Sequence, residues 1–165
     1  MISISKLFKK NNMNEDDIYS VVDGVSFPIE EVNDDVFSKK IMGDGIAIAP
    51  TGSIVCAPCS GELTTVFPTG HAFGITRDDG VEILVHIGLE TVNLKGKGFK
   101  KLKRSNQRVV VGEKIIELDL KYLNSKKVDT TTLIIFLDKK EKNITIEKYK
   151  EVRYGNSVIA HINEL

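Results

Sequence analysis

Two of the chain's three histidines, His71 and His86, could do chemistry together because they lie on the two arms of one predicted hairpin. Residues 71–76 and 81–87 are rich in β-branched and apolar side chains, which is typical of strands. Between them lies Asp79-Gly80, a strong short-range hairpin signal. The loop of this hairpin decides whether the two imidazole rings can meet.

A two-residue loop, formed by Asp78-Asp79 or by Asp79-Gly80, places both histidines on the same face of the hairpin, with Cβ atoms roughly 5 to 8 Å apart. A three-residue loop would place them on opposite faces, because successive strand residues point to opposite sides. With either two-residue loop, the two rings can meet over one spot on the sheet.

Such a histidine pair has three uses. The rings could be unrelated side chains on a half-solvated sheet. They could bind a metal, but a structural zinc takes four ligands and a catalytic zinc usually three protein ligands, and only two are evident. The third use is chemistry on the imidazole itself, with one nitrogen as nucleophile and the other ring donating a hydrogen bond to the developing charge.

Five blocks of this chain match one known family in order and nearly in spacing: GDGIAIAPTG, APCSGEL, TGHAFGI, VEILVHIGLETVNLKGKGF and QRVVVGEKIIELDL. The match as a whole runs from about Pro28 to Leu120, and the blocks include both histidines. By these blocks the chain resembles the glucose-type enzyme IIA of the bacterial phosphoenolpyruvate:sugar phosphotransferase system. The resemblance implies an all-β fold, an antiparallel β-sandwich of the barrel-sandwich type with a duplicated motif and short helical segments.

The resemblance also implies roles for three residues. His86 matches the histidine that is phosphorylated in the family, His71 the supporting histidine, and Thr69 the threonine that orients the supporting ring. The implied donor is the phosphocarrier protein HPr, and the implied acceptor is a cysteine on the IIB domain of a sugar permease. The chemistry suits the pair, since phosphoryl transfer needs mainly positioning and charge stabilisation. Gly88, which has no side chain, would let a partner's backbone approach His86.

The resemblance implies a partner-docking rim of five apolar residues around the histidines, although each could equally be ordinary core. Leu84 is added to the rim because it is apolar on the histidine face of its strand, where a solvated face would usually be polar. The rim consists of Val36, Phe37, Ile41, Met42, Phe67 and Leu84. Two departures from the family affect partner preference rather than the reaction: Gly70 replaces a polar residue, and Glu90 replaces the usual aspartate.

No cofactor is required for this chemistry, but zinc could bind at His71 and His86 if a partner protein completed the shell. Two neutral imidazoles supply half of a tetrahedral zinc site. Such metal-bridged docking occurs between the family's enterobacterial member and a target enzyme. Regulatory target proteins are therefore expected as further partners, and phosphorylation of His86 would exclude them.

Composition describes an ordinary globular chain of 165 residues, with 41% hydrophobic and 28% charged residues and a formal net charge of zero. The zero net charge gives no field that would favour nucleic acid. There is no apolar run long enough to span a membrane and no signal peptide, so a cytoplasmic protein is expected, with a monomer favoured. The chain also has no Walker or kinase glycine motif for a nucleotide.

The two cysteines, Cys56 and Cys59, form a C-x-x-C motif, which in other contexts indicates redox catalysis. A reactive motif of this kind begins a helix, which lowers the pKa of the thiol. Here Ser60 and Gly61 lead into a predicted strand instead. We therefore expect the cysteines to have no catalytic or metal-binding role.

Beyond the site, residues 1–19 are predicted to be a flexible tail and residues 20–165 a single phosphocarrier domain. The start of the tail, MISISKLFKK, has an amphipathic character that could give at most weak membrane contact. The basic cluster at 94–104 is interpreted as a solvated loop with a short helix, because no aromatic platform for nucleic acid accompanies it. His161, in the last predicted strand, is expected to be structural.

The sequence thus predicts a phosphotransferase-system enzyme IIA component that accepts phosphate from phospho-HPr on His86 and passes it to a IIB domain, for uptake of glucose or a related sugar. The alternative from another class is a regulatory binding module that docks partner proteins without phosphoryl transfer. A metal-dependent enzyme is a third hypothesis.

Overall fold

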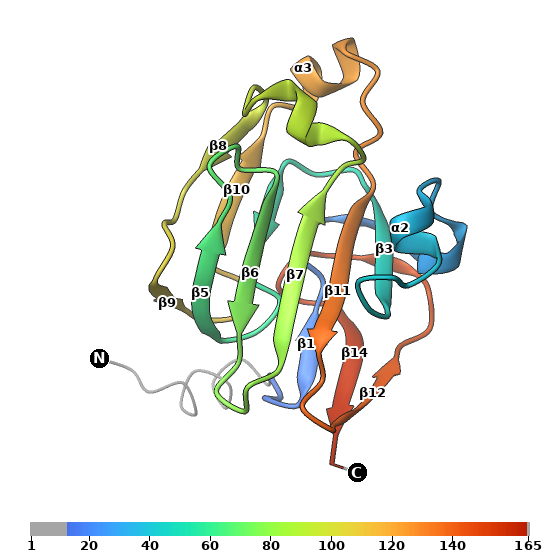
Figure 1. Ribbon diagram of the computed structural model, residues 1–165, viewed down its shortest axis with the longest axis vertical. Coiled ribbons are helices and arrows are strands. Elements are labelled where there is room, and N and C mark those ends of the chain that lie inside the picture. The colour runs from blue at the N-terminus through green and yellow to red at the C-terminus, as the bar shows by residue number, and fades with distance from the viewer. Residues whose placement is uncertain (1–12, 165) are drawn as a thin grey trace.

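The computed structural model describes residues 13–164, which form three sheets with antiparallel pairing throughout (Figure 1). The large sheet has eight strands in the order β13 (Glu151–Val152), β2 (Gly24–Pro28), β3 (Gly45–Pro50), β11 (Thr132–Asp138), β7 (Glu82–Ile87), β6 (Ala72–Thr76), β5 (Gly61–Val66) and β9 (Gln107–Val109). The two small sheets are β1 (Asp17–Tyr19), β14 (Val158–Asn163), β12 (Asn143–Ile146) and β4 (Ile54–Cys56), β10 (Lys114–Leu118), β8 (Phe99–Lys101).

The large sheet packs against both small sheets across one apolar core. Side chains such as Phe73 and Val85 from the large sheet share this core with Ile116 from β10 and Ile159 from β14. This layering confirms the prediction of an all-β antiparallel sandwich. The helical segments are short, as predicted: η1 (Ile29–Glu31), α2 (Asp35–Ser38), η2 (Thr91–Leu94) and α3 (Leu120–Ser125). None of the helices within residues 13–164 is long and apolar enough to cross a membrane.

Strand β7 shows how the sequence pattern produces the two layers. Ile83, Val85 and Ile87 are fully buried in the main core, whereas Leu84 and His86 point to the outer face, as alternation predicts. The outer face is not left to water at this point. A second, smaller apolar cluster covers it, formed by residues of η1, α2 and strands β3, β6, β7 and β11: Ile29, Val32, Phe37, Ala47, Ala72, Leu84, Leu133 and Ile135.

The prediction of a tail over residues 1–19 is wrong at its C-terminal end. Asp17–Tyr19 forms strand β1, which pairs with β14, and Ile18 is fully buried. Ile18 can enter the core because β14 supplies hydrogen-bond partners for the backbone of β1. The amphipathic stretch predicted at the beginning of the chain lies outside the described residues.

The basic cluster at 94–104 also differs from its prediction. Its C-terminal half contains Phe99–Lys101, which is edge strand β8 paired with β10, rather than a short helix. The helical turn of this region, η2, ends at Leu94 and so includes only the first residue of the cluster. The glycines at 96 and 98, both with positive φ, break the helix and favour a turn into the strand.

His161 lies in β14, where it is structural as expected. Its Nδ1 is 2.6 Å from a carboxylate oxygen of Asp17 and its Nε2 is 2.5 Å from one of Glu147. The hydrogen bond with Glu147, followed by that with Asp17, raises the pKa of His161. The His161 ring thus links β1 and β14 to Glu147, the residue that follows β12.

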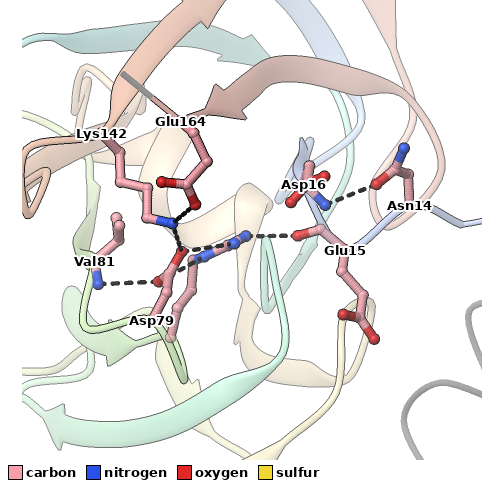
Figure 2. Close-up of polar contacts among 8 residues, drawn as sticks. Asn14, Glu15, Asp16, Asp79, Val81, Lys142 and Glu164 are labelled. Carbon is pink, nitrogen blue, oxygen red and sulfur yellow. Dashed lines mark hydrogen bonds and ion pairs between the residues drawn. The ribbon is translucent and has the colours of Figure 1, made fainter.

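The turn of the β6–β7 hairpin is held by a hydrogen bond to Glu15 and by ion pairs with residues near the C-terminal end of the described chain (Figure 2). The Arg77 guanidinium donates to both carboxylate oxygens of Asp79, at 3.2 and 3.0 Å, and to the backbone carbonyl of Glu15 at 2.8 Å. Lys142, which also pairs with Glu164, is 3.8 Å from Asp79. The Arg77 side chain is only 10% exposed, so losing its partner would leave a largely buried charge.

We expect Asp79→Asn to destabilise the fold by about 2 kcal/mol, since charge-assisted hydrogen bonds at partly buried sites are lost. Asp78→Asn is the matched control, because Asp78 is 71% exposed and pairs with the exposed Arg108; its cost should stay below about 1 kcal/mol. Urea unfolding of both variants measures the difference. Equal midpoints for the two variants would show that the Arg77 cluster does not hold the hairpin.

Candidate functional site

His86 is the second-last residue of β7 and points into the outer apolar cluster. Phe37 of α2 lies against it, with ring centroids 5.0 Å apart. Gly88 follows with φ of 80°, and a Cβ there would lie 2.4 Å from the Thr91 side chain and 2.9 Å from the Asp129 carbonyl. The prediction that Gly88 leaves room for a partner is therefore wrong, because the chain itself fills that space.

The hairpin register differs from both predicted registers. Ala72 pairs with His86, and Arg77 closes on Val81 through its N–H at 3.0 Å, so the loop has three residues, 78–80. A loop of this length would place strictly alternating histidines on opposite faces. The rings nevertheless meet edge to face, with centroids 5.2 Å apart and an interplanar angle of 80°.

The rings meet because His71 precedes β6 and does not follow its alternation. It lies in a bend after Gly70, whose φ is 73°, while its carbonyl still accepts from the Ile87 N–H at 2.7 Å. A Cβ at position 70 would lie 3.0 Å from the Cβ of Phe99. Glycine is required here both for its left-handed backbone and for this close approach.

Thr69 and Phe67 hold the ring of His71 in place. The Thr69 hydroxyl and His71 Nδ1 form a hydrogen bond, and Phe67 packs edge-on against the ring with centroids 5.4 Å apart. If the hydroxyl donates to Nδ1, the proton of neutral His71 lies on Nε2, which makes Nε2 a donor. Thr69 can therefore select the tautomer of His71.

In both His71 and His86, one ring nitrogen is hydrogen-bonded or buried and the other is accessible. His86 Nδ1 is buried and makes no hydrogen bond of regular geometry among the described residues. The Nε2 atoms of His86 and His71 are not among the buried unpartnered atoms and form no hydrogen bond within residues 13–164, so both reach the surface. Any reaction of His86 with an external group must therefore use Nε2.

Burial keeps both imidazoles neutral at neutral pH. It lowers the pKa of His86 to about 4, assisted by His71, while the Gly88 backbone and the charge of Asp34 act in the opposite direction. Burial also lowers the pKa of His71. A neutral His86 offers a lone pair on one nitrogen, as a nucleophile must.

The six residues predicted for the docking rim fall into two groups. Phe37 and Leu84 are 7% and 6% exposed, so for these two the prediction of an exposed rim is wrong. They pack beneath the site, as does the half-buried Phe67. Val36, Ile41 and Met42 are 44%, 69% and 39% exposed, which leaves three apolar side chains available to a partner on and just beyond α2.

Sequence reasoning missed Asp34, which lies near the histidines. Its carboxylate caps α2 by accepting from the Val36 N–H at 2.9 Å, and its charge acts on the pKa of His86. With Glu90 and Asp129 it lines a cavity of about 480 Å³ that also contains Lys126. The Asp that precedes a helix was the available signal, since such residues are preferred N-caps.

The described residues contain no cluster of three or more side chains that could hold a metal ion. His71 and His86 supply two imidazoles, so a metal there would need further ligands from outside the chain. The two cysteines are buried and free, and burial raises the pKa of each to about 12. Neither thiol is a nucleophile at neutral pH.

We predict that His86→Gln reduces the acid sensitivity of folding. Between the unfolded pKa near 6.5 and the folded value of about 4, the unfolded state binds a proton that the folded state does not. Stability is thus lost as the pH falls through this window. Between about pH 7.5 and 5.0, wild type should lose about 1 to 2 kcal/mol more than the variant does, as measured by urea unfolding at both values.

His161→Gln is the control with opposite sign. The raised pKa of His161 gives stability that is present below about 6.5 and lost as the pH rises through the folded value. This variant should therefore lose more stability on acidification than wild type. A His86→Gln curve that parallels wild type would mean that His86 is not held neutral by the fold.

Comparison with known proteins places these residues in context. Residues 16–142 match the family described as phosphoenolpyruvate-dependent sugar phosphotransferase system, EIIA 1. The chain is 41% identical over 156 residues to the glucose-specific EIIA component of Haemophilus influenzae, covering 93% of this chain and 94% of that protein. It is 44% identical over 136 residues to the corresponding Mycoplasma capricolum protein, covering 82% and 88%.

A solved structure, the glucose permease IIA from Mycoplasma capricolum, matches with a TM-score of 0.82 at 41% identity, over 87% of this chain and 93% of that one. The chain also matches part of a longer protein, the glucose-specific EIICBA component of Staphylococcus carnosus, at 42% identity over 142 residues, which are 21% of that protein's length.

Proposed function

The chain belongs to the EIIA 1 family of the phosphoenolpyruvate-dependent sugar phosphotransferase system, and from this premise we propose that His86 carries the phosphoryl group on Nε2. The observation that supports this assignment is the neutral His86 ring, whose only accessible nitrogen is Nε2 and which meets a second neutral imidazole edge to face. His71 and Thr69 are proposed as its supporting residues.

In the proposed step, the lone pair of His86 Nε2 attacks the phosphorus of a phosphohistidine on the donor. The new N–P bond forms as the donor's N–P bond breaks, and the donor imidazole keeps that electron pair. His71 Nε2–H donates to a phosphoryl oxygen, whose charge has little water to stabilise it. Positive charge that develops on the His86 ring is favoured by the Gly88 backbone and by the charge of Asp34, both of which raise the pKa of this ring.

We propose HPr as the donor and the IIB domain of a sugar permease as the acceptor. Glucose or a related sugar is the proposed cargo, because several relatives are named glucose-specific. The identity to the Staphylococcus carnosus glucose and glucoside proteins is 42% and 41%.

His86→Gln should abolish phosphorylation by phospho-HPr, because the nucleophilic nitrogen is replaced by an amide. His71→Gln should still be labelled, since glutamine keeps a donor near the phosphoryl group, but it should pass phosphate to IIB more slowly, by about tenfold or more. Labelling with radioactive phosphoenolpyruvate, enzyme I and HPr measures the first step, and addition of IIB measures the second. Wild-type labelling of His86→Gln would refute the assignment of the carrier residue.

Thr69→Val should slow transfer by about tenfold or more, because the His71 ring loses the hydroxyl that fixes its tautomer and orientation. Thr69→Ser keeps the hydroxyl and should retain most of the rate. The transfer rates of the two variants are compared in reactions with the same donor and acceptor that are quenched at successive times. Equal rates for valine and serine would remove Thr69 from the positioning role.

A second proposed activity is regulatory docking on the same face. It is supported by the exposed apolar side chains of Val36, Ile41 and Met42. Zinc would act there only if a partner supplied the missing ligands to His71 and His86. Calorimetry should find weak zinc binding to the isolated chain, and nanomolar affinity that survives His71→Ala would place the metal elsewhere.

A further inference from the structure

A groove of about 530 Å³ lies beside the histidine site and is not used by the proposed reaction. One wall is the end of β5 and the β5–β6 loop, with Val66 and Pro68. The other is the end of β8 and the connection to β9, with Lys101, Leu102, Lys103 and Arg104. One wall is therefore apolar, and the other carries three cations together with Leu102.

The segment that forms the cationic wall of this groove has no acidic residues to balance its positive charge. Residues 91–112 contain seven lysines and arginines and no carboxylate. Among the described residues, ion pairs engage only two of these cations: Lys103 pairs with Glu113 at 3.1 Å and Arg108 with Asp78 at 2.7 Å. Lys101 and Arg104 are exposed, so their charges face solvent at the groove.

The groove is held in shape by hydrogen bonds to its neighbours. The Val66 N–H donates to the Ser105 hydroxyl at 2.7 Å, the Asn106 N–H to the Leu63 carbonyl at 2.7 Å, and the Leu102 N–H to the Ile115 carbonyl at 2.8 Å. A ligand would therefore meet a preformed site, without a large cost of ordering the connection between β8 and β9.

The groove shares its wall with the histidine site. The β5–β6 loop that supplies Pro68 continues through Thr69 to His71, so the groove wall and the supporting ring are three residues apart. Three residues span at most about 11 Å, whereas a partner that buries about 800 Å² covers a patch roughly 30 Å across. A protein engaged on His86 thus reaches the groove.

We propose that this groove binds an acidic segment of the partner protein that docks on the histidine face, with an apolar residue of the segment packed against Val66 and Pro68. The proposal rests on the proposed phosphoryl-carrier function. Charge complementarity supports it, and so does the concave shape, which a flat bilayer surface fits poorly. Nucleic acid is disfavoured because no aromatic residue lines the groove to stack with bases.

The first test uses the full unphosphorylated chain and a synthetic pentapeptide, Glu-Glu-Leu-Glu-Glu, in an NMR titration at low salt. Amide shifts should move at the groove, and the double variant Lys101→Glu/Arg104→Glu should weaken binding by about tenfold or more. The control Lys139→Glu/Lys148→Glu changes the net charge equally but lies outside the groove, and it should bind within about twofold of wild type. His86→Gln should bind like wild type, so this readout is independent of phosphoryl transfer.

The second test measures transfer from phospho-HPr and to IIB. The groove variant should raise KM by about tenfold for at least one partner without lowering kcat, because it weakens docking rather than chemistry. Unchanged KM for both partners, or peptide shifts that both charge variants reduce equally, would overturn the proposal. It would also be overturned if only phosphatidylcholine–phosphatidylglycerol vesicles, and not the peptide, bound in a groove-dependent way.

Discussion

The edge-to-face contact between His71 and His86 is the interaction on which the rest of the site depends. It needs a ring that leaves strand alternation, and the bend after Gly70 provides that departure. It also needs both rings to be neutral, because two imidazolium ions at this separation would repel each other. Burial under the outer cluster supplies this second condition.

The two apolar clusters have different roles in the molecule. The main core between the sheets stabilises the fold and fixes the direction of β7. The smaller outer cluster buries side chains such as Phe37 and Leu84 and thereby limits the access of water to His86. A partner then meets Val36, Ile41 and Met42 at the surface. The proposed carrier chemistry therefore lies between the buried face of the sheet and these exposed apolar side chains.

The sequence predicted much of this arrangement and failed at identifiable places. Strand alternation correctly divided β7 into core and outer residues, because a strand buried on one face has a strict period of two. The hairpin loop was predicted one residue too short, since Asp78, Asp79 and Gly80 contain two overlapping turn signals. The two errors, in the loop and in the assumed alternation at His71, cancelled, so the rings meet as expected.

Other features depended on contacts that no local pattern contains. Gly88 is required by Thr91 and Asp129, which come close to it only in the folded chain. Phe37 and Leu84 are buried because both pack into the outer cluster, whose members come from distant parts of the sequence. The role of Asp34 beside His86 likewise follows from where α2 packs on the sheet.

We propose that a neutral His86 accepts phosphate on Nε2. Nitrogen-15 NMR of the chain with labelled histidine tests it most directly, before and after phosphorylation by HPr. The His86 ring should stay neutral down to about pH 5, given its pKa of about 4, and a nitrogen–phosphorus coupling should then appear on Nε2 after phosphorylation. Titration of His86 near its ordinary pKa of about 6.5, or coupling to Nδ1, would contradict it.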